Sequence, residues 1–160
     1  MLDFLKRFLG ASTVEAKVVD SDMLETIDSL DIMTAKAAHE NWKVRLDAYL
    51  KGTSSEQFSA EVICFDDRCD LGQWIHGQGK ARLGKFPGFT ALLGHHKMFH
   101  YAASNVVALA KAGKAEQAQA MLEGQFTTFS NEVVATLDLL GEVRTAAKST
   151  RRPKKSSTPA

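Results

Sequence analysis

The chain lacks the features that membrane-spanning, secreted and nucleic-acid-binding proteins share. It contains no apolar run long enough to cross a bilayer. Its first ten residues are too few and too mixed in charge for a secretory signal. Its 20 basic and 19 acidic residues leave a net charge of +1, which gives no reason to expect a nucleic-acid partner. We therefore expect a cytoplasmic protein without a membrane span, in which Cys64 and Cys69 stay reduced.

Proline is also scarce, with three residues in a chain of 160. Few prolines together with regularly spaced apolar residues favour helices, and the length suits a single domain. We predict an all-α fold, an antiparallel four-helix bundle with one short additional helix. The bundle domain is expected to span residues 21–147.

Two flanking segments differ from this domain in composition. Residues 1–20 form a short amphipathic N-terminal segment, in which Leu2, Leu5, Phe8 and Leu9 favour an extra helix packed on the bundle over a membrane contact. Residues 148–160 are basic and carry no apolar anchors, which predicts a disordered tail. A role of this tail in binding an acidic partner or an anionic membrane stays open.

Capping residues and helix breakers set the expected helix bounds. Ser21 or Asp22 can cap a first long helix that runs to Leu50 and stops at Gly52. The segment from Phe58 to Gly79 is the least regular. A short helix is expected there around Leu71 to His76, with glycines 77 and 79 ending it.

Two further helices are expected in the second half of the chain. Pro87 opens a helix that ends near Gly113. In the last helix, the residues that mark the buried face are Leu122, Phe126, Phe129, Val133, Thr136, Leu140, Val143 and Ala147.

Two histidines interrupt the apolar side of the helix that Pro87 opens. His96 and His100 stand at i and i+4, which places both imidazoles on one helix face. The series that contains them has the alternating spacing of four and three of an inward-facing seam: Phe89, Leu93, His96, His100, Ala103, Val107 and Ala110. A buried imidazole without a partner costs about 1–3 kcal/mol, and a bound metal would remove most of that cost.

A third histidine lies on the inward seam of the first long helix. This seam consists of Ile32, Ala35, His39, Trp42, Leu46 and Tyr49. Any one of these histidines alone is better explained as a core residue that hydrogen-bonds a carbonyl or carboxylate. Three of them together with Cys69 favour a tetrahedral zinc site of three imidazoles and one thiolate. Copper or nickel could bind the same ligands.

The cysteine lies in a short motif, Cys69-Asp70-Leu71-Gly72-Gln73-Trp74. This motif resembles the Cys-x-Leu-Gly-x-Trp signature of the chemoreceptor zinc-binding family. The family's other elements occur in order, as His39 on the first helix and as the His-x-x-x-His pair of His96 and His100. The sequence departs from the pattern at Ile75, where an aromatic residue or leucine is expected, and His95 offers a competing register that lies off the seam.

The resemblance covers about residues 22–147 and implies a four-helix domain used for sensing, not for catalysis. It implies a zinc ion held by His39, Cys69, His96 and His100, and a short helix that carries the Cys-x-Leu-Gly-x-Trp motif. It also implies a homodimer and a signalling partner in trans, a chemoreceptor or a diguanylate cyclase. Either zinc itself or an oxidant that attacks the Cys69 thiolate could be the signal.

Several side chains near the motif have simpler explanations. Trp42 and Trp74 are expected to pack around the site as core aromatics, Cys64 to be a small buried residue and His76 to be exposed. Gly72 and Gly94 are candidates for positions where two backbones approach each other closely.

Two other classes of function stay open at this point. A zinc hydrolase would need an open coordination position and a carboxylate base, which Asp66, Asp67 or Asp70 could supply if Cys69 were not a ligand. A helical interaction module that binds no metal would tolerate apolar residues in place of the three histidines.

We predict that Cys69→Ser separates the hydrolase from the sensory site. A catalytic site of three histidines would keep its metal in this variant, because cysteine is not among its ligands. A sensory site of three histidines and one cysteine would lose zinc affinity, because serine is a much poorer ligand. The measurement is the zinc content of both proteins by elemental mass spectrometry. Equal zinc content would contradict the sensory assignment.

Overall fold

The structure is a computed structural model that describes residues 3–10 and 19–151. Every regular element in these residues is helical, which confirms the predicted all-α class. The elements are α1 (Asp3–Leu9), α2 (Ser21–Asp28), α3 (Ile32–Leu50), α4 (Ala60–Ile63), α5 (Asp70–Trp74), the π-helix η2 (Ile75–Gly79), α6 (Lys80–Leu83), α7 (Pro87–Lys111), α8 (Ala115–Met121), the π-helix η3 (Leu122–Phe126) and α9 (Thr127–Arg151).

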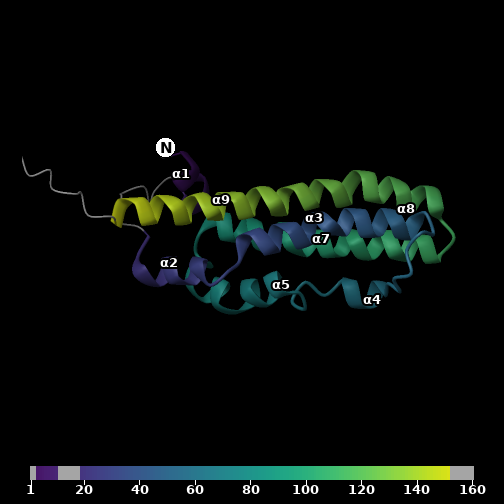
Figure 1. Cartoon of the computed structure of the whole chain (residues 1–160), viewed down its shortest axis with the longest axis horizontal. Coiled ribbons are helices and arrows are strands. Elements are labelled where there is room, and N and C mark those ends of the chain that lie inside the picture. Colours follow the sequence, from purple (N-terminus) through teal and green to yellow (C-terminus); the bar gives the residue numbers. More distant parts are fainter. Residues whose placement is uncertain (1–2, 11–18, 152–160) are drawn as a thin grey trace, which may run out of the picture.

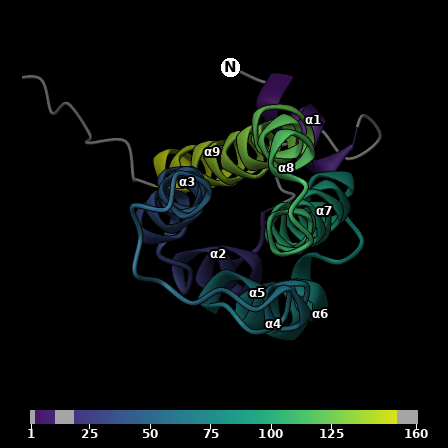
Figure 2. The same ribbon diagram turned by 90° about the vertical axis from the view of Figure 1, so that its right-hand side faces the viewer.

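Three long rods form most of the molecule: α3, α7, and the continuous run of α8, η3 and α9 (Figure 1). Viewed end on, α3 and α7 lie on opposite sides below α8 and α9, and the short helices α2, α4, α5 and α6 fill the remaining side (Figure 2). The chain runs along α3, returns through α4 to α6, runs out again along α7 and returns along α9. Three long rods with one side of short helices therefore stand in place of the predicted four-helix bundle.

The predicted inward seams form the core between these rods. On α7, the buried seam residues are the two histidines with Phe89, Ala103 and Val107. On α3, they are Ile32, Ala35, His39 and Leu46. The predicted face of the last helix is buried as well, with Phe129 only half-buried. The remaining members of the two seams, Leu93 and Ala110 on α7 and Trp42 and Tyr49 on α3, are only half-buried. The 3.6-residue period of the apolar residues therefore predicted most of the inward-facing positions.

The predicted single helix from residue 21 to 50 is wrong, because it consists of two helices with a break at residues 29–31. Asp20, not Ser21 or Asp22, caps α2 by accepting a hydrogen bond from the Met23 amide at 2.8 Å. Asp31 caps α3 by accepting from the Thr34 amide at 3.0 Å. A side chain that accepts from the backbone two or three residues later favours a helix start over a helix interior. The predicted end at Leu50 and Gly52 is confirmed, with Gly52 at a φ of +68°.

The segment around the cysteine motif contains more helix than predicted. The helix that starts at Asp70 is interrupted at Gly77, whose φ of −93° and ψ of −114° are not helical. The chain then returns to a helical conformation at Gly79 and continues through α6 to Leu83. Gly79 therefore does not end a helix. Pro87 opens α7 as predicted, and Gly113, at a φ of +73°, follows its C-cap.

The two ends of the chain are described only in part. The N-terminal segment packs on the bundle as the extra helix α1, with Phe8 fully buried against the core. At the other end, α9 continues to Arg151, so the first four residues assigned to the tail are helical. Residues 152–160, for which disorder was predicted, lie outside the described residues, as do residues 1–2 and 11–18 of the N-terminal segment.

We predict opposite effects of alanine at two glycines of α7. A Cβ atom at Gly88 would lie 2.3 Å from Phe8 Cδ2 and 2.7 Å from Phe8 Cα, so Gly88→Ala must displace α1. Overpacking of this kind costs about 1–3 kcal/mol. A Cβ atom at Gly94 would have no other atom within 4 Å, so Gly94→Ala is expected to stabilise the helix by about 0.5–1 kcal/mol. Urea unfolding of both variants measures the two changes, and equal changes would contradict the close packing of α1 on α7.

Candidate metal centre

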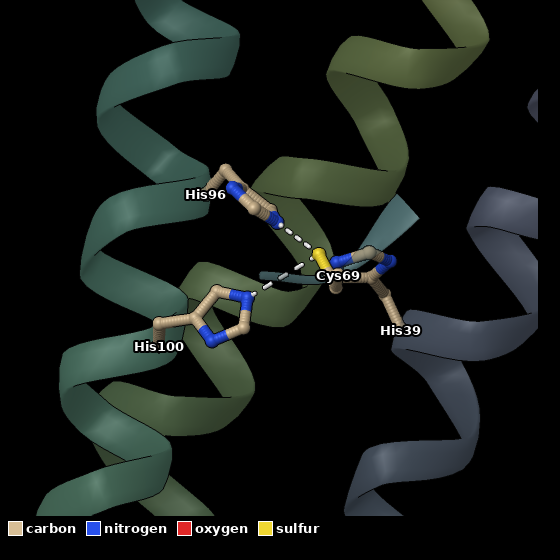
Figure 3. A group of neighbouring side chains, drawn as sticks. All are labelled: His39, Cys69, His96 and His100. Carbon is tan, nitrogen blue, oxygen red and sulfur yellow. Dashed lines mark hydrogen bonds between the residues drawn. The ribbon is translucent and has the colours of Figure 1, made fainter. Parts of the chain in front are cut away.

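Four potential metal ligands from three separate parts of the chain meet in the core. His39, Cys69, His96 and His100 each offer one ligand atom, and these atoms lie within 4.8 Å of one another. Cys69 Sγ lies 3.3 Å from His96 Nε2 and 3.7 Å from His100 Nε2 (Figure 3). The structure thus brings together all four residues that the sequence predicted.

Two long helices and the start of a short one place the four candidate ligands. His39 projects from α3 and the pair of His96 and His100 from α7. Cys69 is the N-cap residue of α5. The three histidines are almost completely buried and Cys69 is half-buried. The thiol is therefore the ligand that lies nearest to the surface.

Backbone carbonyls orient two of the three imidazoles. His39 Nδ1 lies 2.7 Å from the Ala35 carbonyl oxygen, one helical turn earlier. His100 Nδ1 lies 2.8 Å from the carbonyl oxygen of Ile63, at the end of α4. A carbonyl oxygen only accepts, so Nδ1 donates in both residues and Nε2 remains free to bind a metal.

No backbone carbonyl orients the ring of His96 through Nδ1. Its Nδ1 is the one buried side-chain nitrogen or oxygen in the described part of the chain without a hydrogen-bond partner. Its ring packs against the other two imidazoles, at centroid distances of 5.2 Å to His39 and 4.6 Å to His100. Two of the three imidazoles are thus fixed by hydrogen bonds, and the third is fixed by packing.

The Cys-x-Leu-Gly-x-Trp motif builds the turn that presents the thiol. The Gly72 amide donates a hydrogen bond to Cys69 Sγ at 3.3 Å. A Cβ atom at Gly72 would lie 1.8 Å from the Asp66 carbonyl oxygen, so only glycine fits at this position. Gly72 is therefore the close approach that the sequence suggested, whereas Gly94 is not, because nothing lies within 4 Å of a Cβ atom there.

The two apolar residues of the motif anchor the same turn to the core. Leu71 and Trp74 are buried. Trp74 Nε1 donates to the Thr26 carbonyl oxygen at 3.2 Å and to Ser29 Oγ at 3.1 Å, at the end of α2. Trp74 is thus a core aromatic as expected, but Trp42 is only half-buried.

Burial keeps the four side chains uncharged when no cation is bound. It lowers the pKa of His39 and of His100, and it lowers the pKa of His96 to about 2, with the neighbouring His100 and His39 as further causes. Burial raises the pKa of the Cys69 thiol, and the amide of Gly72 opposes this change in part. A neutral imidazole is the form that binds a metal.

The donor set and its dimensions fit zinc. Zn–N distances of about 2.0–2.1 Å and a Zn–S distance of about 2.3 Å imply S···N edges of about 3.6 Å in a tetrahedron. The two S···N distances of 3.3 and 3.7 Å lie on either side of that value. The four residues can therefore fill the coordination sphere of one zinc ion with small adjustments of side chains.

The side chains that could compete for this role lie elsewhere. His95 Nδ1 lies 3.2 Å from Thr136 Oγ1, and its Nε2 lies 3.5 Å from a Glu132 carboxylate oxygen on α9. His76 is exposed, as expected, and pairs with Asp66 at 2.9 Å. Cys64 is half-buried, not buried as expected. Among the described residues, no carboxylate belongs to the cluster of four ligands.

Comparison with known families gives the same assignment. Residues 39–107 match the family model of the chemoreceptor zinc-binding domain, which confirms the resemblance inferred from the motif. This segment begins at His39 and includes all four candidate ligands, so the part of the chain that holds the candidate site is similar to this family's domain. Searches of curated proteins and of solved structures gave no significant match.

Sequence reasoning missed the groups that hold the ligands in place. The Ala35 carbonyl could have been inferred, since it stands four residues before His39 on one helix. The Ile63 carbonyl could not, because it lies 37 residues from His100 and reaches it only through the packing of α4 on α7.

We predict that His96 contributes to the pH dependence of stability in the metal-free protein. The pKa of a histidine is about 6.5 in an unfolded chain and about 2 for His96 in the folded protein. Between these values only the unfolded state binds the proton, so the free energy of unfolding falls by about 1.4 kcal/mol for each pH unit below 6.5. Between pH 7.5 and 5.5, the free energy of unfolding of His96→Leu should therefore fall by about 1.4 kcal/mol less than that of the wild type.

The measurement is urea unfolding of the metal-free proteins at the two pH values. Val106→Ala serves as a control, because Val106 is buried on the same helix and does not titrate. It should lower stability equally at both pH values. An unchanged pH dependence in His96→Leu would contradict a buried neutral imidazole at this position.

Proposed function

We propose that this chain is a sensory domain that binds one zinc ion through His39, Cys69, His96 and His100. The observation that carries the proposal is the convergence of their four ligand atoms within 4.8 Å in a largely buried site. The hydrogen bonds of His39 and His100 support it, because they leave Nε2 of both rings facing the centre of the cluster. The family match supports zinc as the metal.

Zinc, when bound, would favour the thiolate form of Cys69 and join α3, α5 and α7 at one point. His39 and His100 hold their rings in the binding orientation through Ala35 and Ile63. Gly72 donates to the Cys69 sulfur, and this bond becomes stronger when the sulfur carries a negative charge. Trp74 holds the same turn against α2.

A regulatory role fits this arrangement better than catalysis. A catalytic zinc site keeps one coordination position for water and places a base beside it. Here four ligands are available, and the cluster contains no carboxylate. Asp66, one of the three aspartates that a hydrolase could have used as its base, pairs with His76. We therefore propose that the chain is not an enzyme.

Two signals are compatible with this site. In the first, zinc occupancy itself changes the packing of α5 between α2 and α7. In the second, the Cys69 thiolate attacks hydrogen peroxide: an S–O bond forms, the O–O bond breaks, hydroxide leaves, and the sulfur is oxidised by two electrons to a sulfenic acid. A sulfenic acid is a poorer zinc ligand than a thiolate, so the motif would be released from the site.

The remaining parts of the proposal rest on the family resemblance. We propose that the domain acts as a homodimer and passes its signal in trans to a chemoreceptor or a diguanylate cyclase. The cytoplasm, where cysteines stay reduced, is the proposed location. Within the described residues, no helix has both the length and the apolar character needed to cross a membrane.

We predict about one zinc per chain in protein purified without an affinity tag, and loss of this zinc in a double variant, Cys69→Ser with His100→Ala. Elemental mass spectrometry measures both. Hydrogen peroxide should then release zinc from the wild-type protein to a chromogenic chelator, because it converts the thiolate to a sulfenic acid.

Cys64→Ser is the matched control for the oxidation, since Cys64 is the other cysteine of the chain and lies outside the cluster. It should bind zinc and release it with peroxide as the wild type does. If zinc stays bound in the presence of peroxide, oxidation of Cys69 is not the signal, and the zinc concentration is the remaining one. Absence of zinc from the wild type after zinc is supplied would favour a helical module that binds no metal.

A further inference from the structure

A surface pocket of about 760 Å³ leads to one side of the metal centre. It lies between the break that separates α2 from α3 and the helix α5. Thr34 and Ala38 line it from α3 and Gln73 lines it from α5. His39 and Cys69 also line it, so two of the four ligand residues border on this space.

The other two ligand residues do not line the pocket. His96 and His100 project from α7, on the far side of the cluster from His39 (Figure 3). His39 and His100 are equally well buried, at 4% and 5% exposed, so it is the lining of the pocket that separates them. Two further pockets in the described part of the chain, near Tyr49 and near Lys85, contain no ligand residue. Of these three pockets, the one beside Cys69 and His39 is therefore the one that borders on the site.

The walls of this pocket are fixed by hydrogen bonds between α2 and the cysteine segment. Ser29 Oγ accepts from Trp74 Nε1 at 3.1 Å and from Gln78 Nε2 at 2.8 Å. The carboxylates of Asp31 and Asp70 also line the pocket. Negative charge along such an opening raises the local concentration of cations.

We propose that this pocket is the route by which zinc enters and leaves the buried site, a proposal that rests on the zinc-binding function above. An incoming hydrated ion meets Cys69 and His39 first, and His96 and His100 behind them. On release, water or a chelator replaces the same two ligands first. Exchange by this route needs no separation of α3, α7 and α9.

The proposal makes a kinetic prediction at two adjacent alanines of α3. Ala38 lines the pocket, whereas Ala37 does not, and both are exposed. Ala38→Phe places a large side chain in the route, and Ala37→Phe adds the same group to the same helix outside it. Neither residue is a ligand, so both variants should bind one zinc per chain with the wild-type affinity.

In Ala38→Phe, zinc binding and zinc release should both slow about tenfold, equivalent to about 1.4 kcal/mol in the barrier. The two rates should fall by the same factor, because an obstacle that does not touch the bound ion changes the barrier and leaves the equilibrium unchanged. Ala38→Met, with a narrower side chain, should slow both rates by less. Ala37→Phe should exchange zinc as fast as the wild type.

The experiment measures zinc content first, then release to an excess of 4-(2-pyridylazo)resorcinol and binding of added zinc by stopped flow. Equal release rates in Ala38→Phe and Ala37→Phe would overturn the proposed route and point to opening of the bundle. A wild-type protein without zinc would instead overturn the zinc-binding function itself. A slower release accompanied by tighter equilibrium binding would also overturn the route, because it would show a contact with the bound ion.

Discussion

The proposed site depends on a division of roles between the two ring nitrogens of buried imidazoles: one donates a hydrogen bond to the backbone and the other stays available for a metal. In His39 and His100, Nδ1 donates to a backbone carbonyl and Nε2 faces the cluster. Burial keeps these rings neutral, and a neutral ring with one nitrogen already engaged has a single lone pair left for a metal. Because such polar groups cost free energy in an apolar core unless they are satisfied, the surrounding helices are arranged to supply the carbonyls and to bring in the thiol.

The side of the bundle that consists of the short helices α4 to α6 supplies groups that buried imidazoles need. A continuous fourth helix would supply only side chains to the centre, whereas the chain from α4 to α6 supplies the Ile63 carbonyl and the capping thiol of Cys69. Gly72 permits the tight turn against Asp66, and Trp74 ties this turn to α2. The break between α2 and α3 then leaves the pocket that reaches Cys69. The breaks between short helices therefore occur where the site uses a backbone carbonyl and a capping thiol and where the pocket reaches Cys69.

The sequence predicted the position of the candidate ligands better than their surroundings. The inward position of His39, His96 and His100 follows from helical periodicity, which depends only on neighbouring residues. The apolar pattern does not reveal the break at residues 29–31, because the break depends on a polar residue, Asp31, whose side chain caps α3 by accepting from the Thr34 amide. The continuation of helix beyond Gly77 and the Ile63 contact depend on how distant segments pack, which no local pattern encodes.

The measurement that tests the zinc site most directly is X-ray absorption at the zinc edge on the zinc-loaded protein. The account predicts one sulfur at about 2.3 Å and three nitrogens at about 2.0–2.1 Å, with the sulfur lost in Cys69→Ser and kept in Cys64→Ser. A shell of nitrogen and oxygen alone would contradict it, because Cys69 would not be a ligand. Two sulfurs would also contradict it, since only Cys69 belongs to the cluster.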